Sequence, residues 1–116
     1  MTTLPRLDRI ALGVANPEAS LHFYRDLLRL TVQQVGDELH VQLGGTLLAL
    51  ISAAPSERAK LQITFRVGSR EQVDEFAVSL RKAGVHMLSG PADRDGHRVL
   101  YVSDPDNYTI ELYATE

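Results

Sequence analysis

The spacing of apolar residues changes along the chain, and these changes predict where strands and helices lie. Residues 7–14 form an apolar run typical of a strand, which ends just before Asn16-Pro17-Glu18. Asn16 can cap a helix, Pro17 presets φ in the first turn, and Glu18 meets the positive end of the helix dipole. Apolar residues then recur every three or four positions to about Leu28, which predicts a helix with one buried face.

Three short strands are predicted after this helix. They cover residues 31–35, 38–43 and 46–52, separated by Gly36-Asp37 and Gly44-Gly45. Glycine supplies the positive φ that two-residue hairpin turns require, so both dipeptides indicate hairpins. The first half therefore has the order β-α-β-β-β.

The second half repeats this order. Its helix opens at Ser69, with Gln72 three residues later as a capping box, and stops at Gly84. The strands of this half are predicted at 61–67, 85–88, 98–103 and 108–113. The expected fold is α+β, with two duplicated βαβββ modules, at about 6–54 and 58–114, forming a curled mixed sheet around a cavity in a single domain, 1–116.

The two halves differ in length at one place. Equivalent residues of the two halves have a constant sequence separation at first, which is the same for Val14 and Val67 as for Phe23 and Phe76. Leu50 and Leu112, on the last strands, are separated by nine residues more. The extra residues must lie at 89–97, whose glycines, proline and alternating charges are typical of a mobile lid near a site. A plain surface loop has the same composition, so both interpretations stay open.

Composition excludes several classes of protein. The 116 residues include no cysteine, which rules out disulfides, cysteine-bound zinc, iron–sulfur clusters and thiol nucleophiles. The net charge of -3 argues against nucleic acid as a partner. No apolar run is long enough to span a membrane and no signal peptide is evident, so we expect a cytoplasmic protein.

Both ends of the chain resemble the vicinal oxygen chelate superfamily, which contains glyoxalases, bleomycin-resistance proteins and extradiol dioxygenases. The resemblance rests on residues 7–14, 20–28 and 101–112, the last reading Tyr-Val-Ser-Asp-Pro-Asp-Asn-Tyr-Thr-Ile-Glu-Leu. It implies paired βαβββ modules around a cavity and a homodimer. In metal-dependent members it implies a histidine where this chain has Arg9, another where it has Gln62, and a glutamate that matches Glu111.

Side chains alternate between the two faces of a strand, which gives the candidate site. The residues expected to face the cavity and bind a ligand are Arg9, Gln62, Arg66, Glu111 and Tyr113. A guanidinium has no lone pair for a metal, so no metal and no other cofactor is expected; a divalent metal is the alternative if the alignment is shifted. We expect Arg9 to lie across from Glu111, with Gln62 bridging them.

This pattern favours a protein that binds a small anionic or aromatic molecule without a metal. The alternative is an enzyme of the same superfamily, a lyase, isomerase or dioxygenase, with Glu111 as catalytic base or metal ligand. A regulatory subunit with a degenerate site is a third interpretation. The residues leave open whether the protein is catalytic, because a shared fold does not imply shared chemistry.

Replacing Arg9 tests the predicted alignment. The Arg9→His variant places a histidine with Gln62 and Glu111, so we expect it to gain affinity for Ni(II), Fe(II) or Zn(II) that the parent chain lacks. Isothermal titration of both proteins with each ion measures this gain. A variant that binds no metal would indicate that Arg9 and Glu111 do not face each other.

Overall fold

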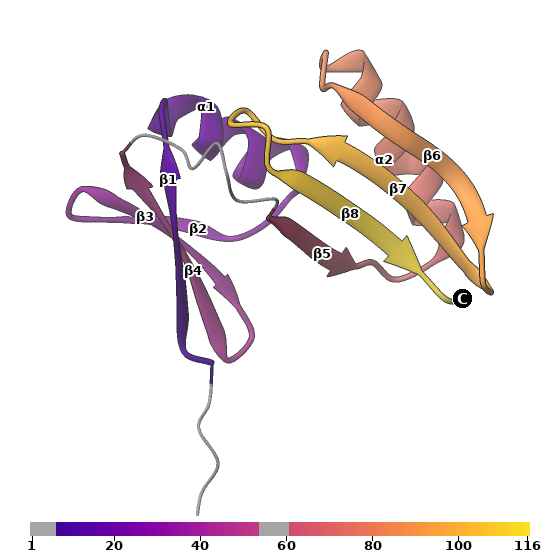
Figure 1. Cartoon of the computed structure of the whole chain (residues 1–116), viewed down its shortest axis with the longest axis horizontal. Coiled ribbons are helices and arrows are strands. Elements are labelled where there is room, and N and C mark those ends of the chain that lie inside the picture. The colour runs from indigo at the N-terminus through magenta and orange to yellow at the C-terminus, as the bar shows by residue number, and fades with distance from the viewer. Residues whose placement is uncertain (1–6, 54–60) are drawn as a thin grey trace, which may run out of the picture. The chain divides into compact units, whose positions relative to one another are not determined.

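The structure is a computed structural model that describes residues 7–53 and 61–116, and each half contains one four-stranded sheet (Figure 1). The chain divides into two compact units, residues 1–56 and 57–116. The first unit contains β1 (Arg9–Val14), α1 (Pro17–Leu21), the π-helix η1 (His22–Leu27), β2 (Val32–Val35), β3 (Glu38–Leu43) and β4 (Thr46–Ser52). The second contains β5 (Gln62–Arg66), α2 (Arg70–Lys82), β6 (Met87–Arg94), β7 (His97–Ser103) and β8 (Thr109–Ala114).

The two sheets have the same topology. Their strand orders are β1-β4-β3-β2 and β5-β8-β7-β6. The first strand of each unit pairs in parallel with the last, and the remaining pairs are antiparallel. This confirms the predicted α+β class and the duplicated βαβββ module; the predicted module limits near 54 and 58 lie outside the described residues.

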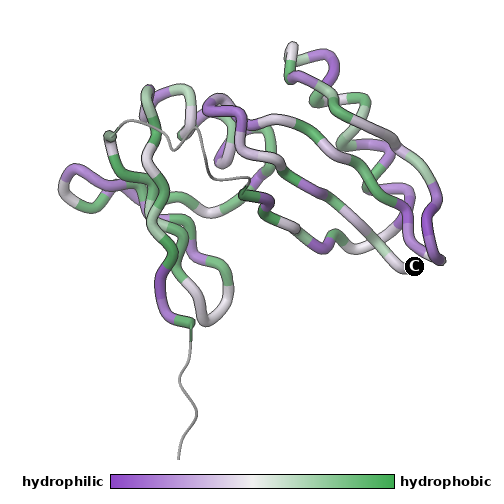
Figure 2. The backbone as a smooth tube through the Cα atoms, viewed as in Figure 1, coloured by the Kyte–Doolittle hydropathy of each residue, from purple (hydrophilic) through white to green (hydrophobic). Residues whose placement is uncertain are grey.

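Alternating polarity along the strands separates a core face from an open face in each unit. Hydrophobic and hydrophilic residues follow one another along the tube in Figure 2. On β8 the apolar Ile110 and Leu112 are buried, whereas the alternating residues Thr109, Glu111 and Tyr113 are partly exposed. The core face thus holds the unit together, and the other face is left for polar side chains.

The first helix changes its hydrogen bonding midway. Asn16 caps it as predicted, accepting hydrogen bonds from the N–H groups of Glu18 and Ala19. The predicted helix to Leu28 is confirmed in extent, but residues 22–27 form a π-turn, shown by the Leu28 N–H donating to the Phe23 carbonyl. The wider turn accompanies the burial of two adjacent aromatic rings, Phe23 and Tyr24, packed edge to face.

The prediction of a loop at 89–97 is wrong. These residues extend β6 and begin β7, and a two-residue turn, Asp95-Gly96, joins the strands, both with positive φ (52° and 82°). Asp-Gly is a strong hairpin signal, but Gly90 and Pro91 pointed to a loop. Pro91 is tolerated because β6 is an edge strand, and a Cβ at Gly90 would stand 2.6 Å from the Val99 carbonyl oxygen.

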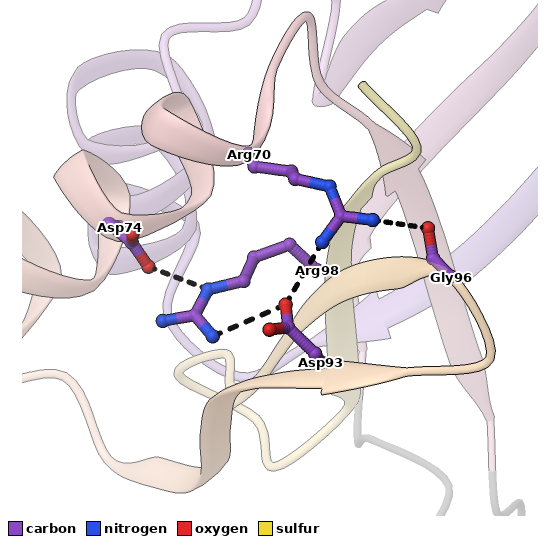
Figure 3. A network of polar contacts seen from close by, with 5 residues as sticks. All are labelled: Arg70, Asp74, Asp93, Gly96 and Arg98. Atoms are coloured by element: carbon purple, nitrogen blue, oxygen red, sulfur yellow. Dashed lines mark hydrogen bonds and ion pairs between the residues drawn. The ribbon is translucent and has the colours of Figure 1, made fainter.

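Ion pairs fasten this hairpin to α2 (Figure 3). The Arg70 guanidinium donates to Asp93 at 3.1 Å and to the Gly96 carbonyl at 2.6 Å. Arg98 donates to Asp74 on α2 at 3.0 Å and to Asp93 at 3.4 Å. These groups are largely exposed, so the pairs orient the hairpin more than they stabilise the fold. The contacts connect the hairpin to α2, and they favour the interpretation of residues 89–97 as a fixed hairpin rather than as a mobile lid.

The turn between β7 and β8 depends on one buried carboxylate. Asp104 is 4% exposed, and its Oδ1 accepts hydrogen bonds from the N–H groups of Asp106 at 2.8 Å and Tyr108 at 2.9 Å. Asn107 takes the left-handed conformation, with φ at 68°, as an asparagine tolerates. The turn places β8 beside β7 in the register that the site requires. Neither described part of the chain has a helix that is long and apolar enough to span a membrane.

Removing the Asp104 carboxylate should therefore destabilise the second unit. We expect Asp104→Ala to lower the free energy of unfolding by about 2 kcal/mol, because a buried N–H group and a partly buried one lose their acceptor. Asp104→Asn keeps an oxygen acceptor and should retain most of the stability. Urea denaturation followed by circular dichroism compares the two variants, and an equal loss in both would contradict this role of Oδ1.

Candidate functional site

A hydrogen-bonded carboxylate lies on the open face of the second sheet. Glu111 Oε1 accepts from Gln62 Nε2 at 3.0 Å and from Thr64 Oγ1 at 2.9 Å, both on β5. Glu111 Oε2 accepts from the Tyr101 hydroxyl at 3.0 Å, on β7. The register explains this arrangement, because Thr64 and Tyr101 pair with Glu111 from its two sides. All three donors are neutral, so the Glu111 carboxylate is held in place by hydrogen bonds and not by an ion pair.

Arginine and aromatic side chains occupy the same face. The Arg66 guanidinium carbon stands 6.0 Å from the centre of the Tyr113 ring, and the Arg94 carbon stands 6.0 Å from that of Tyr101. The His97 ring lies against Tyr113 with a centroid distance of 5.5 Å and a tilt of 31°. Attraction between a cation and the face of a ring holds such pairs together.

Some of these side chains line a small depression. Its volume is about 190 Å³, and its lining residues are Arg94, Asp95, His97, Val99, Tyr101 and Glu111. Arg66 donates a hydrogen bond to Thr115 at 2.8 Å. Among the described residues, the Arg94 guanidinium has no hydrogen-bond or ion-pair partner, and it lies near the Tyr101 ring. The depression therefore has a guanidinium whose donors are open to a ligand.

Burial and the carboxylate both act on Tyr101. Burial is the larger cause that raises the pKa of the Tyr101 phenol, and the hydrogen bond to Glu111 raises it further. The charge of Arg94 opposes this with a smaller effect. Tyr101 is therefore a hydrogen-bond donor at neutral pH rather than a base.

Arg9 has a different carboxylate partner from the one expected. In the first unit its Nη2 donates to both oxygens of Glu38, at 3.0 and 3.1 Å, and His40 Nε2 lies 2.8 Å from Glu38 Oε1. Glu38 stands one strand beyond β4, and we did not consider it as a partner. Arg9 thus has a counter-charge within its own unit, and its pairing with Glu111 stays a prediction.

The remaining site residues behave as the strand alternation predicts. Gln62, Arg66, Glu111 and Tyr113 share the open face, and Gln62 bonds Glu111 directly. Arg94 is not among the predicted site residues, because the composition of residues 89–97 predicts a loop. The Asp-Gly turn, taken with the predicted strand at 98–103, would have placed it opposite His97.

The described residues offer hydrogen-bond donors where a metal would need lone pairs. They contain no group of three or more histidine, cysteine, aspartate or glutamate side chains that could hold an ion. Arg9 has only donors to give, and the Glu111 oxygens already accept three hydrogen bonds. The residues at these three positions, Arg9, Gln62 and Glu111, do not fit a divalent cation.

Comparison with known proteins identifies the family of this fold. Residues 6–112 match the model of the Glyoxalase/Bleomycin resistance protein/Dioxygenase superfamily. The chain belongs to this superfamily. Its topology and the duplicated modules agree with this assignment, and the resemblance expected from both ends of the sequence is confirmed.

Individual members of this superfamily are distant in sequence. The metallothiol transferase FosB of Staphylococcus epidermidis is 27% identical over 116 residues, covering 93% of this chain and 82% of that protein. A glyoxalase/bleomycin resistance protein/dioxygenase from Nocardioides has a TM-score of 0.74 at 23% identity, covering 98% of this chain and 85% of that one. The oxidase ChaP-H2 has a TM-score of 0.77 at 24% identity, covering 97% and 94%. The two structures show the fold alone.

Alkaline titration tests the environment of Tyr101. We expect its phenol to ionise above the ordinary value of 10.0, and Glu111→Gln to reverse only part of this rise, because burial is the larger cause. The folded state holds the proton more tightly, so stability should fall as the pH rises from 10.0 through the raised pKa. The absorbance difference between the parent and Tyr101→Phe isolates this tyrosine, and ionisation at or below 10.0 would contradict the burial.

Proposed function

We propose that the protein binds a small aromatic anion on the open face of the second sheet, without a metal. The observation that carries the proposal is Arg94, whose guanidinium lies over the Tyr101 ring with its donors unused by the described residues. A carboxylate on a flat ring would accept hydrogen bonds from Arg94 and lie against the aromatic side chains.

Two arginines on this face, beside the acids Asp95 and Glu111, supply positive charge for an anionic ligand. Arg66 and Arg94 both stand within 6.0 Å of a tyrosine ring centre, and Glu111 is engaged by neutral donors rather than by either arginine. Both positive charges therefore remain available. An arginine is always protonated, so the attraction should persist across the physiological pH range.

The size of the depression supports a ligand with a single ring. At about 190 Å³ it is smaller than the sites of drug-sized molecules, which are roughly 300–1,000 Å³. Benzoate is the simplest probe that combines one ring with one carboxylate. Every residue of this face belongs to the second unit, so the proposal does not depend on Arg9.

The similarity to FosB favours a second candidate, an enzyme in which Glu111 takes part in group or proton transfer. In this candidate the hydrogen bonds from Gln62, Thr64 and Tyr101 would hold the carboxylate in place for a substrate. Glu111→Gln separates the two candidates, since it should abolish turnover in an enzyme, whereas a binding protein should still bind benzoate through Arg94. We also propose that the chain is a cytoplasmic homodimer.

Arginine substitutions test the binding proposal. We expect Arg94→Gln to weaken benzoate binding by about tenfold or more, because a charge-assisted hydrogen bond contributes roughly 1.5–3 kcal/mol. Isothermal titration calorimetry in the presence of EDTA measures the affinity. Binding that persists in EDTA supports the metal-free proposal, and binding that appears only after a divalent ion is restored would overturn it.

Two controls keep this test specific. Arg81→Gln removes a charge from the exposed last turn of α2 and should leave benzoate affinity unchanged. Benzyl alcohol keeps the ring but lacks the carboxylate, so the parent should bind it more weakly than benzoate. The affinity for benzyl alcohol should be the same in the parent and in Arg94→Gln. If Arg81→Gln and Arg94→Gln weaken binding alike, the ligand responds to overall charge and not to this face.

A further inference from the structure

A histidine and a carboxylate form a second polar cluster, on the open face of the first sheet. His40 is 20% exposed, and its Nε2 lies 2.8 Å from Glu38 Oε1, two residues earlier on β3. The Arg9 guanidinium binds the same carboxylate from β1 at 3.0 Å. Within residues 7–53 and 61–116, His40 forms no other ion pair, and its neighbours across the strands are Gln33 and Ala49.

The carboxylate determines which nitrogen of His40 carries hydrogen. The hydrogen bond from His40, and to a smaller extent that from Arg9, lowers the pKa of Glu38, so its carboxylate is ionised at neutral pH. An ionised carboxylate only accepts hydrogen bonds, so Nε2 must donate. In neutral His40 the lone pair is then on Nδ1, to which no described residue donates a hydrogen bond.

His40 also lines a pocket within the first unit. The pocket has a volume of about 400 Å³, and its other lining residues are Thr31, Gln33, Gln42 and Leu47. This volume falls within the range of roughly 300–1,000 Å³ typical of small-molecule sites. Apart from His40 no lining side chain is ionisable, so the pocket suits an uncharged ligand better than an ion.

The polar groups of the lining have a definite pattern. His40 Nδ1 and Gln42 Oε1 are acceptors, and one of the two hydrogens on Gln42 Nε2 is donated to the Gly44 carbonyl at 2.8 Å. The Gln33 amide and the Thr31 hydroxyl can each donate. A ligand that matches this lining presents an N–H beside carbonyl oxygens on a compact ring that can pack on Leu47.

We propose that this pocket binds a small uncharged cyclic amide or imide, whose N–H donates to Nδ1 of His40. Glu38 acts as a positioning residue that holds His40 in the tautomer with a free Nδ1. The site goes beyond the proposed binding of an aromatic anion, since it uses other residues and a neutral ligand. Failure of benzoate to bind would leave it untouched.

Nuclear magnetic resonance of the histidine nitrogens tests the tautomer first. Long-range proton–nitrogen spectra at a pH where His40 is neutral should show the hydrogen on Nε2, with His40→Gln assigning the signals. Glu38→Gln should convert His40 to a mixture of tautomers. A hydrogen found on Nδ1 in the parent protein would overturn the proposal.

Succinimide and N-methylsuccinimide then test the ligand. Both have two carbonyl oxygens, but only succinimide has an N–H. We therefore expect succinimide to shift the Nδ1 signal of His40 and to bind roughly three- to tenfold more tightly than N-methylsuccinimide. His40→Gln should abolish this preference, and Glu38→Gln should reduce it. Equal binding of both compounds, or no binding of succinimide, would overturn the proposal.

His22 provides a matched control. It also pairs with a carboxylate, Asp26, at 3.0 Å, but on a helix and with a side chain that is 63% exposed. The His22→Gln variant should keep the full preference for succinimide, and the His22 signals should not move during the titration. A shift of His22 equal to that of His40 would show that the compound acts on histidines in general and would overturn the site.

Discussion

A carboxylate on an inner strand of a sheet must keep its hydrogen-bond partners, and Glu111 on β8 meets this requirement through both neighbouring strands. Gln62 and Thr64 donate from β5, and Tyr101 donates from β7. Because these three donors are neutral, neither Arg66 nor Arg94 is needed to compensate Glu111. The same face can therefore hold a carboxylate and two arginines whose charges stay available for a ligand.

Side-chain alternation made much of this face predictable from the sequence. Once β5 and β8 were located, the period of two residues put Gln62, Arg66, Glu111 and Tyr113 on one side. The repeat also predicted that the two halves share one topology, which the two sheets confirm. Two features could not be predicted, because local residue preferences indicated another structure. Gly90 and Pro91 are typical of a loop but lie in β6, and the spacing around Phe23 and Tyr24 is typical of an α-helix but the segment forms a π-helix.

Partner choice for Arg9 was harder to predict, for a physical reason. A long guanidinium reaches across several positions of a sheet, so many carboxylates fall within its range. Glu38 is separated from β1 by β4, and Ala11 on β1 and Ala49 on β4 have small side chains on the same face. Only the combined register of three strands shows that this path is open, and the sequence of one strand does not contain that information.

The register also shows how the two modules came to have different chemistry. Across the first sheet one row of residues is Ala11, Ala49 and His40; the equivalent row in the second is Thr64, Glu111 and Tyr101. With alanine at the central position, the first row has no carboxylate to bind His40, and the ring turns to Glu38 on its own strand.

The two rows thus differ at each of their three positions, and their hydrogen bonds differ with them. In the second unit the central carboxylate uses the hydroxyl of Tyr101, whose ring still faces Arg94. In the first unit the histidine is oriented by a carboxylate to one side and keeps one nitrogen for its pocket. The two rows keep the same backbone register, and their side chains decide whether each face presents guanidinium groups or a free acceptor.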